Sequence, residues 1–263
     1  MIMLDKEMVK EMISKQNTRI DERRFDEYRK IKIEQGIIEN AEGSARVEIG
    51  NTKVIAGVKI ESGEPFPDRP DEGVIVVGGE FVPFASPEFS PGPPSDEAIE
   101  LARVVDRVIR ESNAIDLKKM VINKANVWRV MIDILVLDND GNLFDTAVLA
   151  AVAALLNAKM PIFKIDDEKV EIDYYNKGTE PLPIIRKPVS VTIAKVSNAL
   201  IVDPNLVEEE TMDALLTIGS FEDNDNIFLC AMQKGGSKGF TKEEIEDAID
   251  LAIEKGKELR MLL

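Results

Sequence analysis

The sequence predicts an α+β protein with two lobes, each a sheet with helices packed on one face. Three observations favour this class. Segments rich in β-branched residues and bounded by turn residues occur in clusters. Long patterns of helical periodicity follow these clusters. From near Arg186, four strands followed by a helix repeat the order of elements in the first half of the chain. We therefore expect a first domain at 1–185, which includes an N-terminal helix, and a second domain at 186–263.

The first lobe is expected to begin with a short helix at 4–16, followed by a polar connector that carries four arginines. Four segments then have the composition of strands, and they lie at 30–38, 45–49, 54–60 and 74–84. Gly50 and Asn51 predict a hairpin turn, so the first three strands should form an antiparallel meander. The pair Gly78 and Gly79 predicts a bulge in the fourth strand.

The stretch FSPGPPSDEAIELARVVDRVIRES, at 89–112, begins as a proline-rich loop and continues as an amphipathic helix. Ser95 can cap this helix, and the two acids that follow it occupy the first turn, where the helix dipole favours them. Its apolar face is expected to consist of Ala98, Leu101, Ala102, Val105, Val108 and Ile109. The opposite face carries Arg103, Arg107 and Arg110, which are three and four residues apart.

A long buried strand is expected from Val127, closing on a hairpin turn at Asp140 and Gly141 rather than on a calcium loop. The alanine-rich segment at 143–159 predicts a helix that must be covered on most sides, because nearly all its residues are apolar. The strands of the second lobe are expected in VSVTIAKV, NALIVDP, MDALLTIGS and NIFLCAMQ. A final helix should begin at Lys242.

Composition excludes several kinds of chemistry. The 263 residues include no histidine and one cysteine, so a Ser-His-Asp or Cys-His arrangement and a Cys/His metal cage are impossible. Cys230 lies in an apolar run, which predicts a buried, inert thiol. We expect no cofactor. The chain has no apolar run long enough for a membrane span and no signal-peptide pattern, so we expect a cytoplasmic protein without a membrane partner.

Charge leaves two interpretations open for the arginines. The formal net charge of −16 argues against a chain wrapped in nucleic acid. Between residues 100 and 130, however, seven Lys/Arg and four Asp/Glu give a net charge of +3, so a polyanion site should be sought there. The alternative is a solvated face that is paired with itself. The spacing allows the pairs Glu100 with Arg103, Asp106 with Arg110, and Arg107 with Glu111.

Four segments together resemble the RNase PH family, and within it the non-catalytic RNase PH-type subunit of the archaeal exosome. They are GSARVEIGNTKVIAGVKIESGEP, FSPGPPSDEAIELARVVDRVIRES, VWRVMIDILVLDNDGNLFDTAVLAAVAAL and GFTKEEIEDAI, in order over nearly the whole chain. The resemblance implies two RNase PH-type lobes, the first of them ribosomal protein S5 domain 2-like. It also implies a hexameric ring around an RNA channel, in which three copies of this chain alternate with three copies of a catalytic RNase PH-type partner.

The resemblance implies further partners and an activity for the assembly. Proteins with S1 and KH-type RNA-binding domains are expected to cap one face of the ring. The catalytic partner is expected to shorten single-stranded RNA from the 3′ end with inorganic phosphate. This chain would then complete the channel wall and help to bind the RNA.

This chain departs from the pattern of the active members at two places. Active members carry paired arginines and a serine where this chain has Pro93, Pro94 and Ser95. Proline offers neither a charge nor a backbone N–H, so it cannot hold a phosphate. Active members also place an acid at the start of a second-lobe strand, and that position falls on Ala214, with Asp213 as the adjacent alternative. The resemblance therefore implies a subunit without catalytic residues.

The resemblance assigns Arg103 and Arg107 to the RNA backbone, reached across the dimer interface near the active site of the partner. Arg110 shares the face and is a third RNA-binding candidate, ranked lower because Asp106 is its expected partner. Two alternatives to an RNA-binding ring subunit stay open. One is a phosphorolytic 3′-to-5′ exoribonuclease active in its own right, with Asp213 as its acid. The other is a globular scaffold whose arginines never touch RNA.

Overall fold

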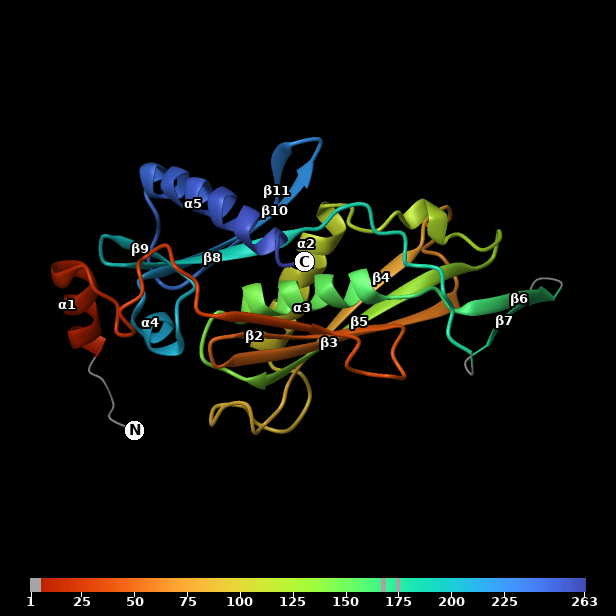
Figure 1. Ribbon diagram of the computed structural model, residues 1–263, viewed down its shortest axis with the longest axis horizontal. Coiled ribbons are helices and arrows are strands. Elements are labelled where there is room, and N and C mark those ends of the chain that lie inside the picture. The colour runs from red at the N-terminus through yellow and green to blue at the C-terminus, as the bar shows by residue number, and fades with distance from the viewer. Residues whose placement is uncertain (1–5, 167–168, 174–175) are drawn as a thin grey trace.

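The structure is a computed structural model that describes residues 6–166, 169–173 and 176–263. It contains two main sheets and the helices that pack on them (Figure 1). The strands of the first sheet lie in the order β1-β2-β3-β5-β4, and those of the second lie in the order β11-β10-β8-β9. The α+β class predicted from the sequence is confirmed.

The elements have the following bounds. The first sheet consists of β1 (Ile31–Gln35), β2 (Gly43–Ile49), β3 (Thr52–Gly63), β4 (Val74–Phe81) and β5 (Val127–Asp138). The second consists of β8 (Val189–Val196), β9 (Ala199–Val202), β10 (Ala214–Asp223) and β11 (Asn226–Gly235). The helices are α1 (Lys6–Gln16), α2 (Asp96–Glu111), η1 (Leu117–Met120), α3 (Leu143–Asn157), α4 (Leu206–Thr211) and α5 (Lys242–Arg260). A separate hairpin consists of β6 (Ile162–Asp166) and β7 (Lys169–Asp173).

The expected meander of β1, β2 and β3 is antiparallel, and Gly50 makes its turn with a φ of 59°. The bulge expected in β4 is wrong, because β4 pairs with β5 in parallel without a break through Gly78 and Gly79. Gly79 has a packing role instead. A Cβ at Gly79 would lie 3.0 Å from the carbonyl oxygen of Ala98, so the glycine lets α2 approach the strand closely.

The hairpin expected at Asp140 and Gly141 is also wrong, because this turn leads from β5 into α3. Gly141 and Asn142 have φ values of 81° and 56°, both in the left-handed region that glycine and asparagine tolerate best. A DG pair predicts a tight turn from local geometry alone. Whether a strand or a helix follows depends on the next segment, and here that segment is helical.

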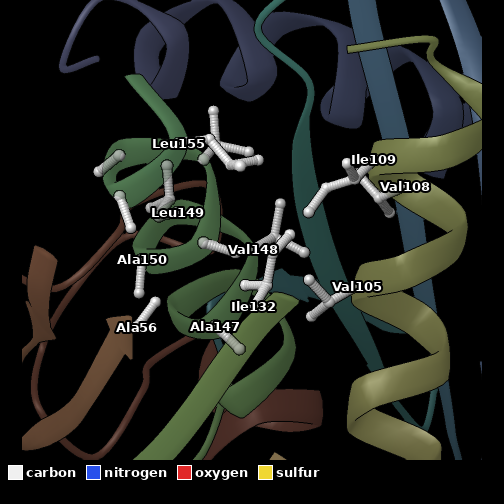
Figure 2. Close-up of a cluster of buried hydrophobic side chains, with 14 of the residues drawn as sticks. Ala56, Val105, Val108, Ile109, Ile132, Ala147, Val148, Leu149, Ala150 and Leu155 are labelled. Atoms are coloured by element: carbon white, nitrogen blue, oxygen red, sulfur yellow. The ribbon is translucent and has the colours of Figure 1, made fainter. Parts of the chain in front are cut away.

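Helix α3 is buried between the two sheets, as its apolar sequence requires. Every residue from Asp145 to Leu155 is buried. In Figure 1, α3 lies between the first sheet and β8, and α5 lies on the far side of β8. Figure 2 shows Val105 and Ile109 of α2 pointing toward Val148 of α3. Helix α5 thus packs on one face of the second sheet, and α2 and α3 close its other face.

The N-terminal segment connects the lobes. The helix expected at 4–16 is observed as α1 from Lys6, and its first two expected residues lie outside the described residues. Two of its side chains, Val9 and Ile13, pack against strands of the second sheet. The division of the chain at residue 185 stays a prediction. No helix within the described residues is long and apolar enough to cross a membrane.

Asp145, in the first turn of α3, is a fully buried carboxyl group at the junction of the two lobes. One of its oxygens accepts hydrogen bonds from Tyr28 Oη, Asn142 Nδ2 and the Thr192 backbone N–H, at 2.8, 3.0 and 2.8 Å. The other accepts from the hydroxyl groups of Ser190 and Thr192, each at 2.8 Å. Burial raises the pKa of Asp145 to about 6, although these donors favour the ionised form.

The contacts of Asp145 predict losses of stability of different size for two substitutions. We expect Asp145→Ala to lower the free energy of unfolding by about 3 kcal/mol, because it leaves buried donors without an acceptor. We expect Asp145→Asn to cost less than about 1 kcal/mol at pH 7.5, because its amide can donate to the two hydroxyl groups and still accept from the other donors. Urea denaturation measures both. The exposed control Asp247→Asn should stay within about 0.5 kcal/mol.

The same pair of proteins tests the pKa of Asp145. A folded-state pKa of about 6 lies above the unfolded value, so the stabilising contribution is present at low pH and is lost as the pH rises through 6. Wild type should therefore gain stability relative to Asp145→Asn as the pH falls from 7 to 5. A stability difference that is independent of pH would contradict this assignment.

Candidate RNA-binding face

The outer face of α2 carries the predicted arginines beside β11 of the second lobe. Arg103 and Arg107 are exposed, and Arg110 is half-buried. We call the first two and their surroundings the arginine face. The shallow depression at this face is lined by Val77, Asp96, Ile99, Glu100, Ala102, Arg103, Asp106, Arg107 and Gln233. Ser95 caps the helix by accepting a hydrogen bond from the Ala98 backbone N–H at 3.3 Å, as the sequence predicts.

Arg110 is held by its own helix and by the neighbouring strand. Its guanidinium group donates to both carboxylate oxygens of Asp106, at 3.1 and 2.5 Å. It also donates to the backbone carbonyl of Ile75 in β4 at 3.0 Å. The hydrogen bonds to Asp106 raise the pKa of Arg110 above its ordinary value. The expected pair with Asp106 is confirmed, and Arg110 is the least available of the three arginines for a ligand.

The other two expected ion pairs on α2 are wrong. Arg107 donates to Gln233 Oε1 at 2.6 Å, and Gln233 Nε2 donates to Glu100 at 2.6 Å. Arg103 makes no hydrogen bond or ion pair within the described part of the chain. The sequence could not predict Gln233 as a partner, because this residue belongs to β11, in the other lobe. Arg103 is thus an unpaired cation, and Arg107 binds only a neutral amide.

The proline-rich loop before α2 does not provide an anion site. The depression at this loop is lined by Glu80, Phe81, Pro83, Glu88, Phe89, Ser90, Pro91, Gly92, Pro93, Pro94, Ser95 and Glu97. These described residues include three acids and no basic side chain. The pKa of Glu97 is lowered by hydrogen bonds from its own backbone and from Ser95. A carboxylate that is already ionised beside the loop disfavours a phosphate there.

Asp213, the alternative catalytic acid, is buried and held as an anion. Its carboxylate lies 3.0 Å from the ammonium groups of Lys10 and Lys238 and accepts from the Ser197 backbone N–H at 3.0 Å. Burial raises the pKa of Asp213, but these donors outweigh burial and leave the pKa below its ordinary value. Such a group is a poor proton donor near neutral pH. Ala214, the other candidate for that catalytic position, is fully buried.

The connector between α1 and β1 also looks basic in the sequence, but three of its four arginines are largely buried in ion pairs, and the fourth, Arg24, pairs with Asp26 at the surface. Arg19 is fully buried and forms an ion pair with Glu208 at 2.6 Å. Arg29 binds the buried carboxylate of Asp203 at 2.8 Å.

Cys230 is half-buried rather than buried, and burial raises the pKa of its thiol to about 11, so it stays protonated. Neither Cys230 nor the connector arginines extend the arginine face.

Comparison with known proteins agrees with this fold. Residues 27–161 match domain 1 of the 3′ exoribonuclease family, and residues 187–255 match domain 2 of the same family. The chain belongs to the RNase PH family. The two matches together cover both main sheets, so the two RNase PH-type lobes predicted from the sequence are confirmed.

Similar RNase PH-family proteins come from archaea. Exosome complex component Rrp42 of Thermococcus gammatolerans is 51% identical over 250 residues, which cover 95% of this chain and 90% of that protein. A solved structure described as the Archaeoglobus fulgidus exosome with RNA bound to the active site is 46% identical, with a TM-score of 0.87 and coverage of 97% and 96%. A second, described as an archaeal exosome core, is 42% identical, with a TM-score of 0.83 and coverage of 97% and 94%.

The different contacts of the arginines predict different effects on stability. We expect Arg110→Ala to lower the free energy of unfolding by about 1 to 2 kcal/mol, because it leaves Asp106 and the Ile75 carbonyl without their partner. Arg103→Ala should change it by less than about 0.5 kcal/mol, because Arg103 has no partner to lose. Urea denaturation of the two variants measures this contrast. Equal losses would contradict the assignment of Arg110 as the anchored residue.

Proposed function

We propose that this RNase PH-family chain is a non-catalytic subunit of an archaeal exosome and that it binds RNA through Arg103 and Arg107. The observation that carries the proposal is the arginine face itself. Arg103 is exposed and unpaired, and Arg107 is exposed and held by a neutral group. The similar proteins support the assignment, since one is named an exosome component and another is described as an exosome with bound RNA.

In this proposal, three copies of the chain alternate with three copies of a catalytic RNase PH-type partner in a hexameric ring. Proteins with S1 and KH-type domains cap the ring, and the complex degrades single-stranded RNA in the cytoplasm from the 3′ end with phosphate. A chain of net charge −16 repels RNA over most of its surface, so binding depends on the few exposed cations near the channel. This favours a supporting subunit over an independent nuclease.

The chemistry of the arginine face suits an RNA backbone. Guanidinium groups four residues apart on a helix point to the same side and donate to phosphate oxygens in a planar fork. In the proposal, these contacts hold the RNA while its 3′ end lies in the active site of the partner. The chain then contributes to catalysis by positioning the substrate and not by transferring a proton.

The alternative of an exoribonuclease active in its own right lacks a suitable acid. Asp213 is held as an anion by Lys10 and Lys238, with a lowered pKa. The depression before α2 offers acids where a phosphate would have to bind. No observation on the described residues favours this alternative.

Charge reversal tests the RNA contact. We expect the double variant Arg103→Glu, Arg107→Glu to weaken binding of a single-stranded RNA by the assembled ring by at least about tenfold at low salt. The slope of log affinity against log salt should become shallower by about 1.4, since each lost phosphate contact on a single strand contributes about 0.7. Fluorescence anisotropy over a salt series measures both quantities.

The matched control for this experiment is Lys242→Glu, Lys257→Glu, which reverses two exposed cations on α5 and changes the net charge equally. It should leave the affinity within about twofold. A similar loss in both double variants would show that only the net charge matters. No loss in either would favour a scaffold whose arginines do not touch RNA.

The division of labour between the subunits can be measured directly. We expect the purified chain with RNA, inorganic phosphate and magnesium to release no nucleoside diphosphates, and the assembly with a catalytic partner to release them. Asp213→Ala within the assembly should leave the rate within about twofold, provided that the variant stays folded. Release by the chain alone, abolished by Asp213→Ala, would make the chain an exoribonuclease instead.

A further inference from the structure

Arg103 has carboxylates nearby on both sides along α2, yet it pairs with neither. Glu100 lies three residues before it and Asp106 three residues after it, and both positions allow a helical ion pair. Both acids line the same depression as Arg103. An exposed arginine between two such carboxylates would ordinarily be neutralised at least in part. Something in the structure therefore keeps the acids away from it.

Each acid is held by another residue. Asp106 accepts hydrogen bonds from Nε and Nη2 of Arg110, at 3.1 and 2.5 Å. Glu100 is bound by the side-chain amide nitrogen of Gln233 at 2.6 Å. The amide oxygen of Gln233 at the same time accepts a hydrogen bond from Arg107 at 2.6 Å. Gln233 thus lies between Glu100 and Arg107, two charged side chains that would otherwise be available for ion pairs.

A primary amide is well suited to this position. It carries both a donor and an acceptor, whereas a carboxylate only accepts and a guanidinium group only donates. The nitrogen of Gln233 therefore must face Glu100, and its oxygen must face Arg107. Because the amide is neutral, it orders the Arg107 side chain without cancelling its charge. A glutamate at this position would pair with Arg107 and repel Glu100 toward Arg103.

We propose that Gln233 is a positioning residue for RNA binding, whose side-chain amide holds Glu100 away from Arg103. The inference rests on the proposed role of Arg103 and Arg107 as RNA contacts. Without Gln233, Glu100 pairs with Arg103 across one helical turn, and an incoming phosphate has to displace that carboxylate. The second lobe thereby controls the charge that the first lobe presents to RNA.

A double-variant cycle tests the proposal on the assembled ring. The variants are Gln233→Ala, Glu100→Gln and their combination, and the probe is a fluorescently labelled single-stranded oligoadenylate. Gln233→Ala should weaken binding about twofold to threefold, which is the effect of one exposed helical ion pair on Arg103. The combined variant should bind as tightly as Glu100→Gln alone, because the released residue is then uncharged. Gln35→Ala, an exposed glutamine on β1, is the matched control and should have no effect.

The rescue separates positioning from a merely structural role. If Gln233→Ala weakens binding and Glu100→Gln does not restore it, the loss comes from disorder of Arg107 and the proposal is overturned. No effect of Gln233→Ala also overturns it. The charge-reversed Arg103→Glu, Arg107→Glu variant in the same assay distinguishes failure of the proposed RNA contact from failure of the proposed role of Gln233. If that variant binds normally, the proposed RNA contact fails and the inference fails with it; if it binds weakly, only the cycle decides on Gln233.

Discussion

The burial of α3 between the two sheets is the constraint on which the rest of the structure depends. Its small alanine side chains let both sheets approach closely. Its apolar surface is removed from water only if both sheets cover it. The one carboxyl group that is buried with it, Asp145, then needs donors from every side. It finds them on the N-terminal connector, on the turn before α3 and on β8. Hydrophobic packing and buried hydrogen bonds therefore hold the two lobes together at the same place.

This arrangement also fixes the surroundings of α2. The helix lies beside α3, and its Val108 approaches β10 so closely that a Cβ at Gly219 would lie 2.8 Å from it. The next strand, β11, consequently runs along the exposed side of α2. The arginine face is for this reason composed of both lobes: the helix supplies the cations, and the strand supplies the amide that orders one of them.

The contacts of each arginine depend on the segments that surround it. Arg19 and Arg29 of the connector form buried ion pairs with Glu208 and Asp203, so loss of one partner would leave a buried charge unpaired between the N-terminal segment and the second lobe. Arg110 is tied to Asp106 and to β4. Arg103 and Arg107 are left with solvent and a neutral partner. Arg103 and Arg107 lie four residues apart on one helix face without acidic partners, so they form a local basic site in a strongly acidic chain, and such a site suits a polyanion.

The sequence by itself determined the local elements and the family. Helical and strand periodicities, the Ser95 cap and the turn at Gly50 depend on neighbours within a few residues, and they appear in the structure close to where the sequence places them. The apolar character of α3 already required cover on most sides. The proline pair before α2 already excluded a phosphate clamp there, because proline lacks both charge and donor whatever the fold around it.

Only the tertiary structure decided which side chains meet. From the sequence, the glycine pair of β4 indicated a bulge, but in the structure Gly79 allows α2 to pack closely on the strand. The DG pair indicated a hairpin, but a helix follows this turn. The sequence offered Glu100 as a partner for Arg103 and Glu111 for Arg107. The structure brought Gln233 to Glu100 and Arg107 instead, and Lys10 and Lys238 to Asp213. Ion pairs form between neighbours in space, and those neighbours belong to segments whose contact is set by the folding of the whole chain.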